Sequence, residues 1–520
     1  MGAALQGLTA LFSITVGIYF LLGITWGFAI SFMPGVGGIV AISLLLPFIY
    51  RLSLPAALAL LLGAHIATIF GSSITSIVLN VPGASKSVPL CWDGYPLAQK
   101  GQGVRALSAS ATSSAVGGII GAVVLAFAIP LLRPVLFAIG PGEIFLLAVL
   151  GLLVISVFSS GTLGKGLASA ALGALISWIG LDPVSGISRF TFGSLTLQQG
   201  IPFPVAAIGV FAIAQAIKLL VASRNNSSDP GGARVKKINR SQVNDAANHS
   251  GQITQGIRDV FQHKRLEVRM ALFGVFCGVI PGLGAPVAAV GAYGQAAESG
   301  KEDDEIPFGS GRIEGVMAPQ ATDGASEGGG MLPLLALGIP AHEQQAILLS
   351  AFIILGIAPG QQLVTHHLPL VFTIVWIIIL GNLAVSIIGI GISPLLAKLT
   401  NLPTLVLGPV IISAGLIGAV AINGVAANAA MALGFGIFGY FMARYQYSRA
   451  SFVVGFVLGP ILESNLHIAT SLHGNLFFVT SPLAAVLSLA ILVVLVGTVR
   501  RSRRKARRGE SAHTVYSPPV

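Results

Sequence analysis

The sequence predicts an all-α polytopic membrane protein, because apolar residues dominate it, charged residues are scarce and several apolar runs are long. Apolar residues fill 54% of the 520 positions and charged residues only 9%, against roughly a quarter charged in soluble proteins. A helix needs about 20 apolar residues to cross a bilayer. We predict spanning helices in four windows, residues 8–32, 116–132, 368–392 and 482–499. The runs are continuous and rich in Leu, Ala and Gly, as in packed membrane helices, and lack the alternation of a membrane barrel.

One polar stretch divides the chain. Residues 222–265 carry eight basic against three acidic residues, and seven more basic residues follow a hydrophobic run between positions 500 and 508. Basic segments beside membrane helices stay in the cytoplasm, so we place both there. The predicted organisation is a first membrane repeat (1–221), a cytoplasmic linker (222–265), a second membrane repeat (266–499) and a cytoplasmic tail (500–520).

The two halves carry the same signals in the same order. Pro-Gly-x-Gly interrupts an apolar run at residues 34–37 and again at 281–284, and a polar small-residue segment ending at proline follows each, at 71–83 and 322–340. Such internal symmetry is typical of secondary transporters. The loop after the first motif is mainly basic and the loop after the second mainly acidic, with Lys86, Lys100 and Arg105 against Glu298, Glu302, Asp303, Asp304 and Glu305. We interpret this difference as two membrane faces, and therefore predict inverted-topology repeats with broken or re-entrant helices.

The broken helices are the predicted binding site. Proline removes a backbone donor and glycine permits positive φ, so each motif frees backbone amides, which membrane proteins tolerate where they line a cavity. Helix starts there would offer N–H groups to an anion. The alternative is that these residues only kink helices or allow close crossings. The candidates from the two motifs are Pro34, Gly35, Gly37, Gly38, Pro281, Gly282 and Gly284.

The polar segments supply further candidates, since hydroxyl and amide groups can hold a carboxylate or replace the hydration shell of a cation. They are Ser72, Ser73, Thr75, Ser76 and Asn80 in the first half and Thr322, Asp323, Ser326, Glu327 and Pro340 in the second. Asp323, with Thr75 and Asn80, is a candidate for the coupling ion, because an acidic residue in a membrane helix is expensive. The alternatives are hydroxyls bonded back to their own helix and an Asp323 exposed in a long loop.

Other polar residues are predicted to be structural. His65 lies in an apolar run, where a local hydrogen bond is favoured over proton movement. His342 with Glu343, and Glu463 with Asn465, follow prolines and are expected to cap helix starts. Cys91 and Cys277 lie in different halves, which excludes a disulfide framework or zinc set, and no phosphate loop or dinucleotide fingerprint occurs. We expect no catalytic residues, no metal, no cofactor and no nucleic-acid partner.

The motifs also resemble those of the large membrane subunit of bacterial tripartite tricarboxylate transporters, over about residues 17–495. The resemblance rests on residues 33–38, 71–83, 93–98, 314–319, 333–340 and 458–465. Gln320, Asp323 and Ala341 stand where the family usually has Glu, Asn and Gly. The resemblance implies a complex with a small four-helix membrane subunit and a periplasmic solute-binding protein that delivers an organic carboxylate, in the bacterial inner membrane.

Electrical work indicates how such a substrate is driven. A trianion that enters against an inside-negative potential costs roughly 7 kcal/mol per 100 mV. We therefore expect import of small di- or tricarboxylates by Na⁺ or H⁺ symport, through alternating access around the paired breaks. The chain is expected to contact lipid on many sides and possible partners include a second copy. The alternative is a non-transporting channel or scaffold subunit, and an intramembrane enzyme is a weaker third class.

Overall fold

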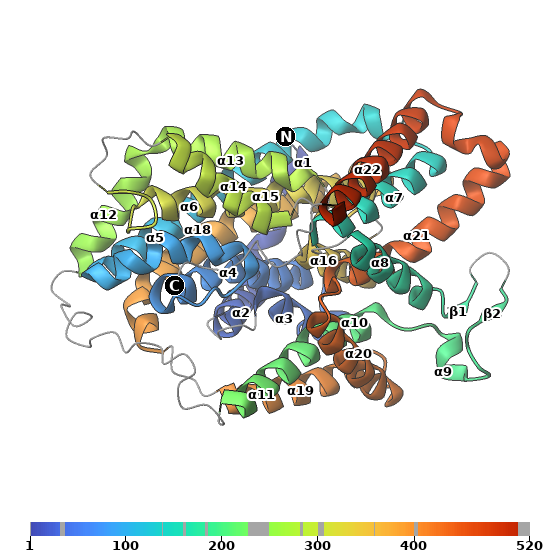
Figure 1. The fold of residues 1–520 in the computed structure, drawn as a ribbon, viewed down its shortest axis with the longest axis horizontal. Coiled ribbons are helices and arrows are strands. Elements are labelled where there is room, and N and C mark those ends of the chain that lie inside the picture. The colour runs from blue at the N-terminus through green and yellow to red at the C-terminus, as the bar shows by residue number, and fades with distance from the viewer. Residues whose placement is uncertain are drawn as a thin grey trace.

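The computed structural model describes residues 2–31, 37–137, 139–159, 163–182, 186–226, 249–280, 284–299, 306–357, 359–399 and 404–507. Helices account for nearly all of this part of the chain, and one two-stranded hairpin accompanies them (Figure 1). Within it, six helical segments are long and apolar enough to cross a membrane: Ile14–Ser31, Leu54–Leu79, Ser85–Leu131, Phe203–Val221, Leu368–Ile392 and Ser451–His473. The all-α polytopic class is thereby confirmed.

The elements of the first half are α1 (Gly2–Thr9), η1 (Ala10–Phe12), α2 (Ile14–Ser31), α3 (Gly37–Ser43), η2 (Leu46–Arg51), α4 (Leu54–Leu79), η3 (Ser85–Ser87), α5 (Val88–Leu97), η4 (Ala98–Gln102), α6 (Gly103–Phe137), α7 (Pro141–Ser159), α8 (Leu163–Ser177), β1 (Gly180–Leu181), β2 (Ser188–Arg189), α9 (Leu195–Gln198), α10 (Phe203–Ala207), η5 (Ile208–Ile213) and α11 (Ala214–Asn226). Strands β1 and β2 pair antiparallel, with Gly180 opposite Arg189.

The elements of the second half are α12 (His249–Gln262), α13 (Lys264–Val279), α14 (Gly284–Ser299), α15 (Glu314–Leu337), α16 (Glu343–Ile354), α17 (Gln361–His366), α18 (Leu368–Leu399), α19 (Thr404–Ala421), α20 (Ala427–Arg444), α21 (Arg449–His473), η7 (Gly474–Val479) and α22 (Pro482–Arg507). Part of the predicted linker is helical, because α12 lies inside residues 222–265. It packs on α6, where Arg105 Nε lies 2.7 Å from Asp259 Oδ2.

The predicted window at residues 8–32 is not one helix. Residues 10–12 form a short turn of helix, and Ser13 has an extended backbone, so α1 and α2 are separate. Helix α1 packs against α18 instead of continuing α2, and Trp376 Nε1 donates a hydrogen bond to Ala4 O at 3.0 Å. The other three windows lie inside single helices, α6, α18 and α22.

Helices α4 and α15 end in the same way. Each is followed by a residue with positive φ, Asn80 at 56° and Gly338 at 70°. The next amide reaches back six residues, from Val81 N to Thr75 O at 3.3 Å and from Ile339 N to Pro333 O at 3.2 Å. This arrangement satisfies carbonyls that would otherwise be orphaned at a helix end. A proline follows in both cases and prevents the helix from continuing.

Close packing explains why α15 is a helix despite its glycines. Helix α15 lies against both α6 and α13, and a Cβ added at Gly324 or Gly328 would come closer than 3.0 Å to α6, at Ser114 O or at the backbone of Gly121. Membrane helices approach closely through such small residues. The polar, glycine-rich run of α15 is therefore a tightly packed interior helix.

The first half contains a matching contact. A Cβ at Gly27 of α2 would come closer than 3.0 Å to Ala64 O of α4, and a Cβ at Gly274 of α13 would come equally close to Thr322 O of α15. Gly27 and Gly274 stand at the same distance before their Pro-Gly-x-Gly motifs, and Ala64 and Thr322 at the same distance before the prolines that follow α4 and α15. The pairs α2–α4 and α13–α15 thus pack through corresponding positions.

The interpretation of the two charged loops as two membrane faces stays a prediction, because Glu302, Asp303, Asp304 and Glu305 lie outside the described residues. Lys100 Nζ donates a hydrogen bond to Ser310 O at 2.7 Å, and Asp93 Oδ1 accepts hydrogen bonds from three backbone amides of residues 309–312 at 2.8 to 2.9 Å. The segment that follows α4, which forms α5 and η4, therefore meets residues 309–312, just before α15.

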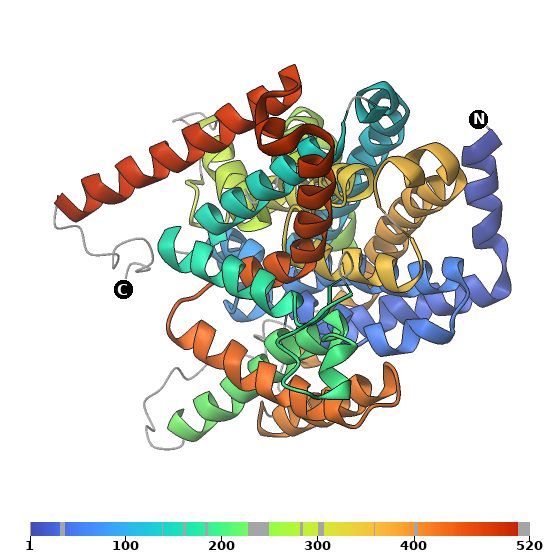
Figure 2. The ribbon, with the colours of Figure 1, turned by 90° about the vertical axis from the view of Figure 1, so that its right-hand side faces the viewer.

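Further helices form two groups around α2, α4, α6, α13 and α15. Helices α7, α8, α21 and α22 pack together, and α11, α19 and α20 pack with η5. Figure 1 shows the second group below the centre and the first on the right, and in Figure 2 α22 extends away from the body toward the C-terminus. Each group combines helices from the ends of both halves of the chain.

Candidate functional site

A group of charged side chains lies buried where the two halves meet. Lys86 Nζ lies 2.9 Å from Asp323 Oδ1 and 3.6 Å from Glu327 Oε1, and the exposed fraction of each of the three side chains is 6% or less. Lys86 comes from η3 in the first half, and the two carboxylates project from successive turns of α15 in the second. We call Lys86, Asp323, Glu327, His65 and His342 the central cluster.

Two histidines complete the central cluster around Glu327. His65 Nε2, from the middle of α4, lies 2.7 Å from Glu327 Oε2, and His342 Nε2, just before α16, lies 3.3 Å from the same oxygen. The imidazole rings stack with centroids 6.5 Å apart. Glu327 is thus surrounded by three basic groups, whereas Asp323 forms an ion pair with Lys86 alone among the described residues.

Helices α4 and α15 run in opposite directions past this cluster. His65 faces Glu327, while Ser73, two turns further along α4, donates a hydrogen bond to Gln320 Oε1 at 3.0 Å, two turns earlier on α15. Contacts that advance on one helix and recede on the other require antiparallel axes. Helices α4 and α15, one from each half, therefore face each other antiparallel across the central cluster.

Several buried polar atoms of the central cluster and of two neighbouring glutamines have no hydrogen-bond partner. They include His65 Nδ1, Lys86 Nζ, Gln320 Nε2, Asp323 Oδ1, Glu327 Oε1 and Gln345 Nε2. Lys86 Nζ and Asp323 Oδ1 are close enough for a strong ion pair, but their angle does not meet hydrogen-bond geometry. Buried polar groups in native proteins nearly always have a hydrogen-bond partner. A concentration of buried polar atoms without one therefore indicates that these groups bind another partner.

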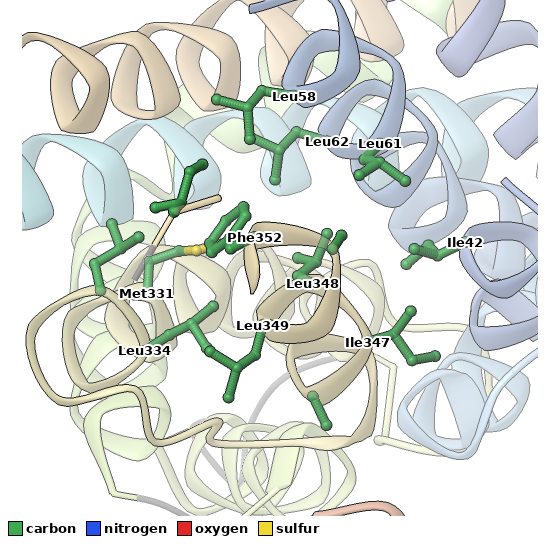
Figure 3. Close-up of a cluster of buried hydrophobic side chains, with 14 of the residues drawn as sticks. Ile42, Leu58, Leu61, Leu62, Met331, Leu334, Ile347, Leu348, Leu349 and Phe352 are labelled. Carbon is green, nitrogen blue, oxygen red and sulfur yellow. The ribbon is translucent and has the colours of Figure 1, made fainter. Parts of the chain in front are cut away.

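An apolar layer closes one side of the cluster. Met331 and Leu334, on the turns of α15 after Glu327, pack with Leu58 and Leu62 of α4 and with side chains of α16 (Figure 3). These side chains are almost completely buried. Apolar walls strengthen electrostatic interactions inside the site because they exclude water.

A narrow crevice leads to the other side of the cluster. It is lined by His342 and Ser326 together with Cys277, Gly278, Ala285, Ala288 and Ala341, from α13, α14 and the turn before α16. The crevice has no space for a water molecule in this conformation. A substrate could reach Lys86 from here only after the helices around the crevice move apart.

The predicted hydroxyl residues of α4 are buried but mostly bonded within their own helix. Ser72, Thr75 and Ser76 bond to carbonyls of the preceding turn at 2.9 to 3.2 Å. Two of them also reach other elements: Ser73 donates to Gln320 Oε1 of α15 at 3.0 Å and Ser76 to Ser87 Oγ of η3 at 2.9 Å. Asn80 is exposed at the end of α4 and contributes its left-handed backbone rather than a ligand.

The predicted residues of the second half's polar segment are also buried. Thr322 donates a hydrogen bond to Met270 O at 2.9 Å and Ser326 to Asp323 O at 2.8 Å, while Pro340 is buried in the turn between α15 and α16. Asp323 is 4% exposed and lies within α15, so the alternative of an exposed loop position is wrong. Asp323 therefore is a buried charge at the centre of the molecule.

The breaks themselves are only partly described. Pro34, Gly35, Pro281 and Gly282 lie outside the described residues. Gly37 and Gly284 begin α3 and α14. Gly38 is buried, and a Cβ there would come closer than 3.0 Å to Thr68 and to the Gln344 side chain. The first-half break is thus followed by a helix packed against the segment that follows α15.

The two predicted capping pairs have different outcomes. His342 and Glu343 stand at the start of α16, as predicted, but the His342 side chain makes no capping hydrogen bond and faces Glu327 instead. Glu463 lies inside α21, because Pro460 does not end that helix, and it forms an ion pair with Arg189 at 2.5 Å. His65 likewise bonds to Glu327 across to the other half and not to a local group.

Lys86 belongs to the central cluster but is not among the binding residues predicted from the sequence. It was interpreted only as a loop charge, yet it supplies the single lysine of the central cluster. Its signal was present, since Lys86 lies between Pro82-Gly83 and Pro89 in a run of small and apolar residues. A buried carboxylate such as Asp323 also requires a cation nearby.

Within the described ranges, no three side chains of His, Cys, Asp or Glu are placed to hold a metal ion together. The chemistry that the central cluster can perform is the binding of an anion by Lys86 and the exchange of protons among carboxylates and imidazoles.

Comparison with known proteins gives a family. Residues 18–454 match the model of the tripartite tricarboxylate transporter TctA family. The chain is 32% identical to an uncharacterised 52.8 kDa protein in the TAR-I ttuC' 3' region of Agrobacterium vitis, over 96% of both chains. It is 34% identical to an uncharacterised protein in the TAR-II ttuC' 3' region of the same organism, over 45% of this chain and 96% of that protein. No solved structure gives a significant match.

Proposed function

Because this chain belongs to the tripartite tricarboxylate transporter TctA family, we propose that it is the translocating subunit of a secondary transporter that imports small organic di- and tricarboxylates. The central cluster carries the proposal. Charged groups buried in membrane helices mark substrate and ion pathways, and these groups lie where the two halves of the chain meet. The transporter family also argues against an enzyme.

Lys86 is the proposed anchor for a substrate carboxylate. It is a buried ammonium group with three donors and no hydrogen bond of good geometry,. It lies on the short element η3, between the end of α4 and the start of α5. A carboxylate that enters through the crevice would meet Lys86 with His342 and Ser326 at its entrance.

The arrangement of α4 and α15 supports alternating access. Corresponding helices of inverted repeats run antiparallel, as α4 and α15 do at the central cluster,. The matching helix ends and the matching contacts of Gly27 and Gly274 also favour a repeat. We propose that the halves exchange roles, so that the cluster opens to one side and then to the other.

Uptake requires an ion gradient and two partners. A dianion or trianion that moves inward against an inside-negative potential costs about 2.3 kcal/mol per charge per 100 mV, so cotransported Na⁺ or H⁺ must offset this work. We place the chain in the bacterial inner membrane, with residues 222–265 and 500–520 in the cytoplasm. A small four-helix subunit and a periplasmic binding protein would complete the complex.

Reconstituted transport tests this function. The chain and its small partner are placed in proteoliposomes, with the binding protein outside and an imposed Na⁺ or H⁺ gradient, and uptake of labelled succinate and citrate is measured. Accumulation that depends on the gradient is expected. The Lys86→Gln/Asp323→Asn variant, in which a positive and a negative charge are removed together, is expected to lose uptake.

Lys100→Gln is the matched control, because Lys100 is an exposed lysine bonded to Ser310 O. It should transport like the wild type. If no carboxylate of the di- and tricarboxylate series accumulates under either gradient, or if uptake equilibrates without concentrating the substrate, the channel or scaffold alternative replaces the symporter.

A further inference from the structure

We propose that the substrate carboxylate and Asp323 compete for Lys86, and that Asp323 takes up a proton when it is displaced, so that substrate entry carries one proton with it. The inference rests on the proposed function and specifies how the coupling ion is bound. It follows from the unequal environments of the two carboxylates that flank Lys86.

Glu327 does not depend on Lys86. His65 Nε2 and His342 Nε2 lie 2.7 and 3.3 Å from its Oε2, whereas Lys86 lies 3.6 Å from its other oxygen. Asp323 depends on Lys86 alone, at 2.9 Å, and its own Oδ1 has no hydrogen bond of good geometry. When Lys86 turns to another anion, Glu327 keeps its basic neighbours and Asp323 loses its ion-pair partner.

The other titratable groups around α15 cannot replace Lys86. In the part of the chain that the structure describes, His342 is the other basic group within electrostatic range of Asp323, but it is held by Glu327. On α13, the buried Glu267 accepts a hydrogen bond from Ser113 of α6, and the Cys277 thiol lines the crevice. On α5, Asp93 is held by backbone amides and by Tyr293 of α14. None of these groups brings a second cation to Asp323.

A buried carboxylate without a cation is far more stable as the neutral acid. The exchange is balanced, since the ion pair between the Lys86 ammonium and the Asp323 carboxylate is replaced by an ion pair between the same ammonium and the substrate carboxylate. The only covalent bond formed is the O–H bond of the Asp323 carboxylic acid, with a proton from the solution that loads the site. Release on the other side reverses both steps and returns the proton.

Calorimetry of substrate binding tests the exchange. The complex of this chain with its small subunit is titrated with succinate, at a pH where both succinate carboxyl groups are ionised, in two buffers that differ in ionisation enthalpy. The wild type is expected to take up about one proton per succinate bound, and over the pH range in which this uptake occurs, where Asp323 is ionised without succinate and protonated with it, the affinity should fall about tenfold per pH unit.

Asp323→Asn removes the competing charge and the proton acceptor together. This variant should bind succinate more tightly, with proton uptake near zero and no pH dependence, while Asp323→Glu should restore uptake. The matched control is Asp259→Asn, because Asp259 is also a buried aspartate paired with a basic residue, Arg105, but lies outside the central cluster. Its proton uptake should equal that of the wild type.

The outcomes separate this inference from the proposed function. If wild-type protein binds neither succinate nor citrate, the proposed function fails. If it binds them with no proton uptake, with Na⁺ dependence in place of pH dependence, or with uptake that persists in Asp323→Asn, the proposed function stands and the exchange at Lys86 is wrong.

Discussion

Removing Lys86 alone should destabilise the protein more than removing Lys86 together with Asp323. At an effective dielectric constant of about 20, a charge pair at the 2.9 Å between Lys86 and Asp323 is worth about 6 kcal/mol and one at the 3.6 Å to Glu327 about 5 kcal/mol, before desolvation offsets most of both,. Removing one partner of a buried pair typically costs about 3–5 kcal/mol, because the other charge stays buried.

The comparison therefore uses Lys86→Gln, Lys86→Gln/Asp323→Asn and the surface control Lys100→Gln. We expect a loss of about 3–5 kcal/mol for the single variant and recovery of at least half of it in the double variant, because Glu327 keeps His65 and His342. The control should lose less than about 1 kcal/mol. Midpoints of SDS-induced unfolding in mixed micelles measure the order. A single variant as stable as the double variant would refute a charged Lys86–Asp323 pair.

Three further predictions concern packing and loops. Gly328→Ala should destabilise by about 1–3 kcal/mol or more, because its Cβ would clash with the α6 backbone, whereas Gly434→Ala, with open space at its Cβ, should be neutral or stabilising; the same SDS titration compares them,. Asp93→Asn should loosen residues 309–312, since three amides lose a charged acceptor, and hydrogen exchange of those amides should accelerate at least tenfold,. Glu463→Gln should cost about 1 kcal/mol or less, measured as a shift of the SDS midpoint, because Arg189 is partly exposed; a loss comparable to that of Lys86→Gln would contradict this estimate,.

Hydropathy predicted the fold class because lipid imposes one solution on long apolar runs. The windows inside α6, α18 and α22 are uniformly apolar, and an unpaired backbone in lipid would be too expensive, so each forms a helix,. The same reasoning missed the interruption at Ser13, since a local extended residue hardly changes the average hydropathy of residues 8–32.

The central cluster was only half predictable. Asp323 stood out because an acid in a membrane helix is expensive. Its partners did not, because Lys86 and His65 lie more than 200 positions away in the sequence, and one sequence does not show which helices of the two halves face each other.

Helix α15 has a practical consequence for mapping this protein across the membrane. Its 24 residues would be about 36 Å long, enough for the hydrocarbon layer,, yet its glycines and acidic residues keep it out of the helices that hydropathy selects in the described chain. A topology map drawn from hydropathy would omit it. Reporter fusions on either side of residues 314–337 would therefore orient the whole second half.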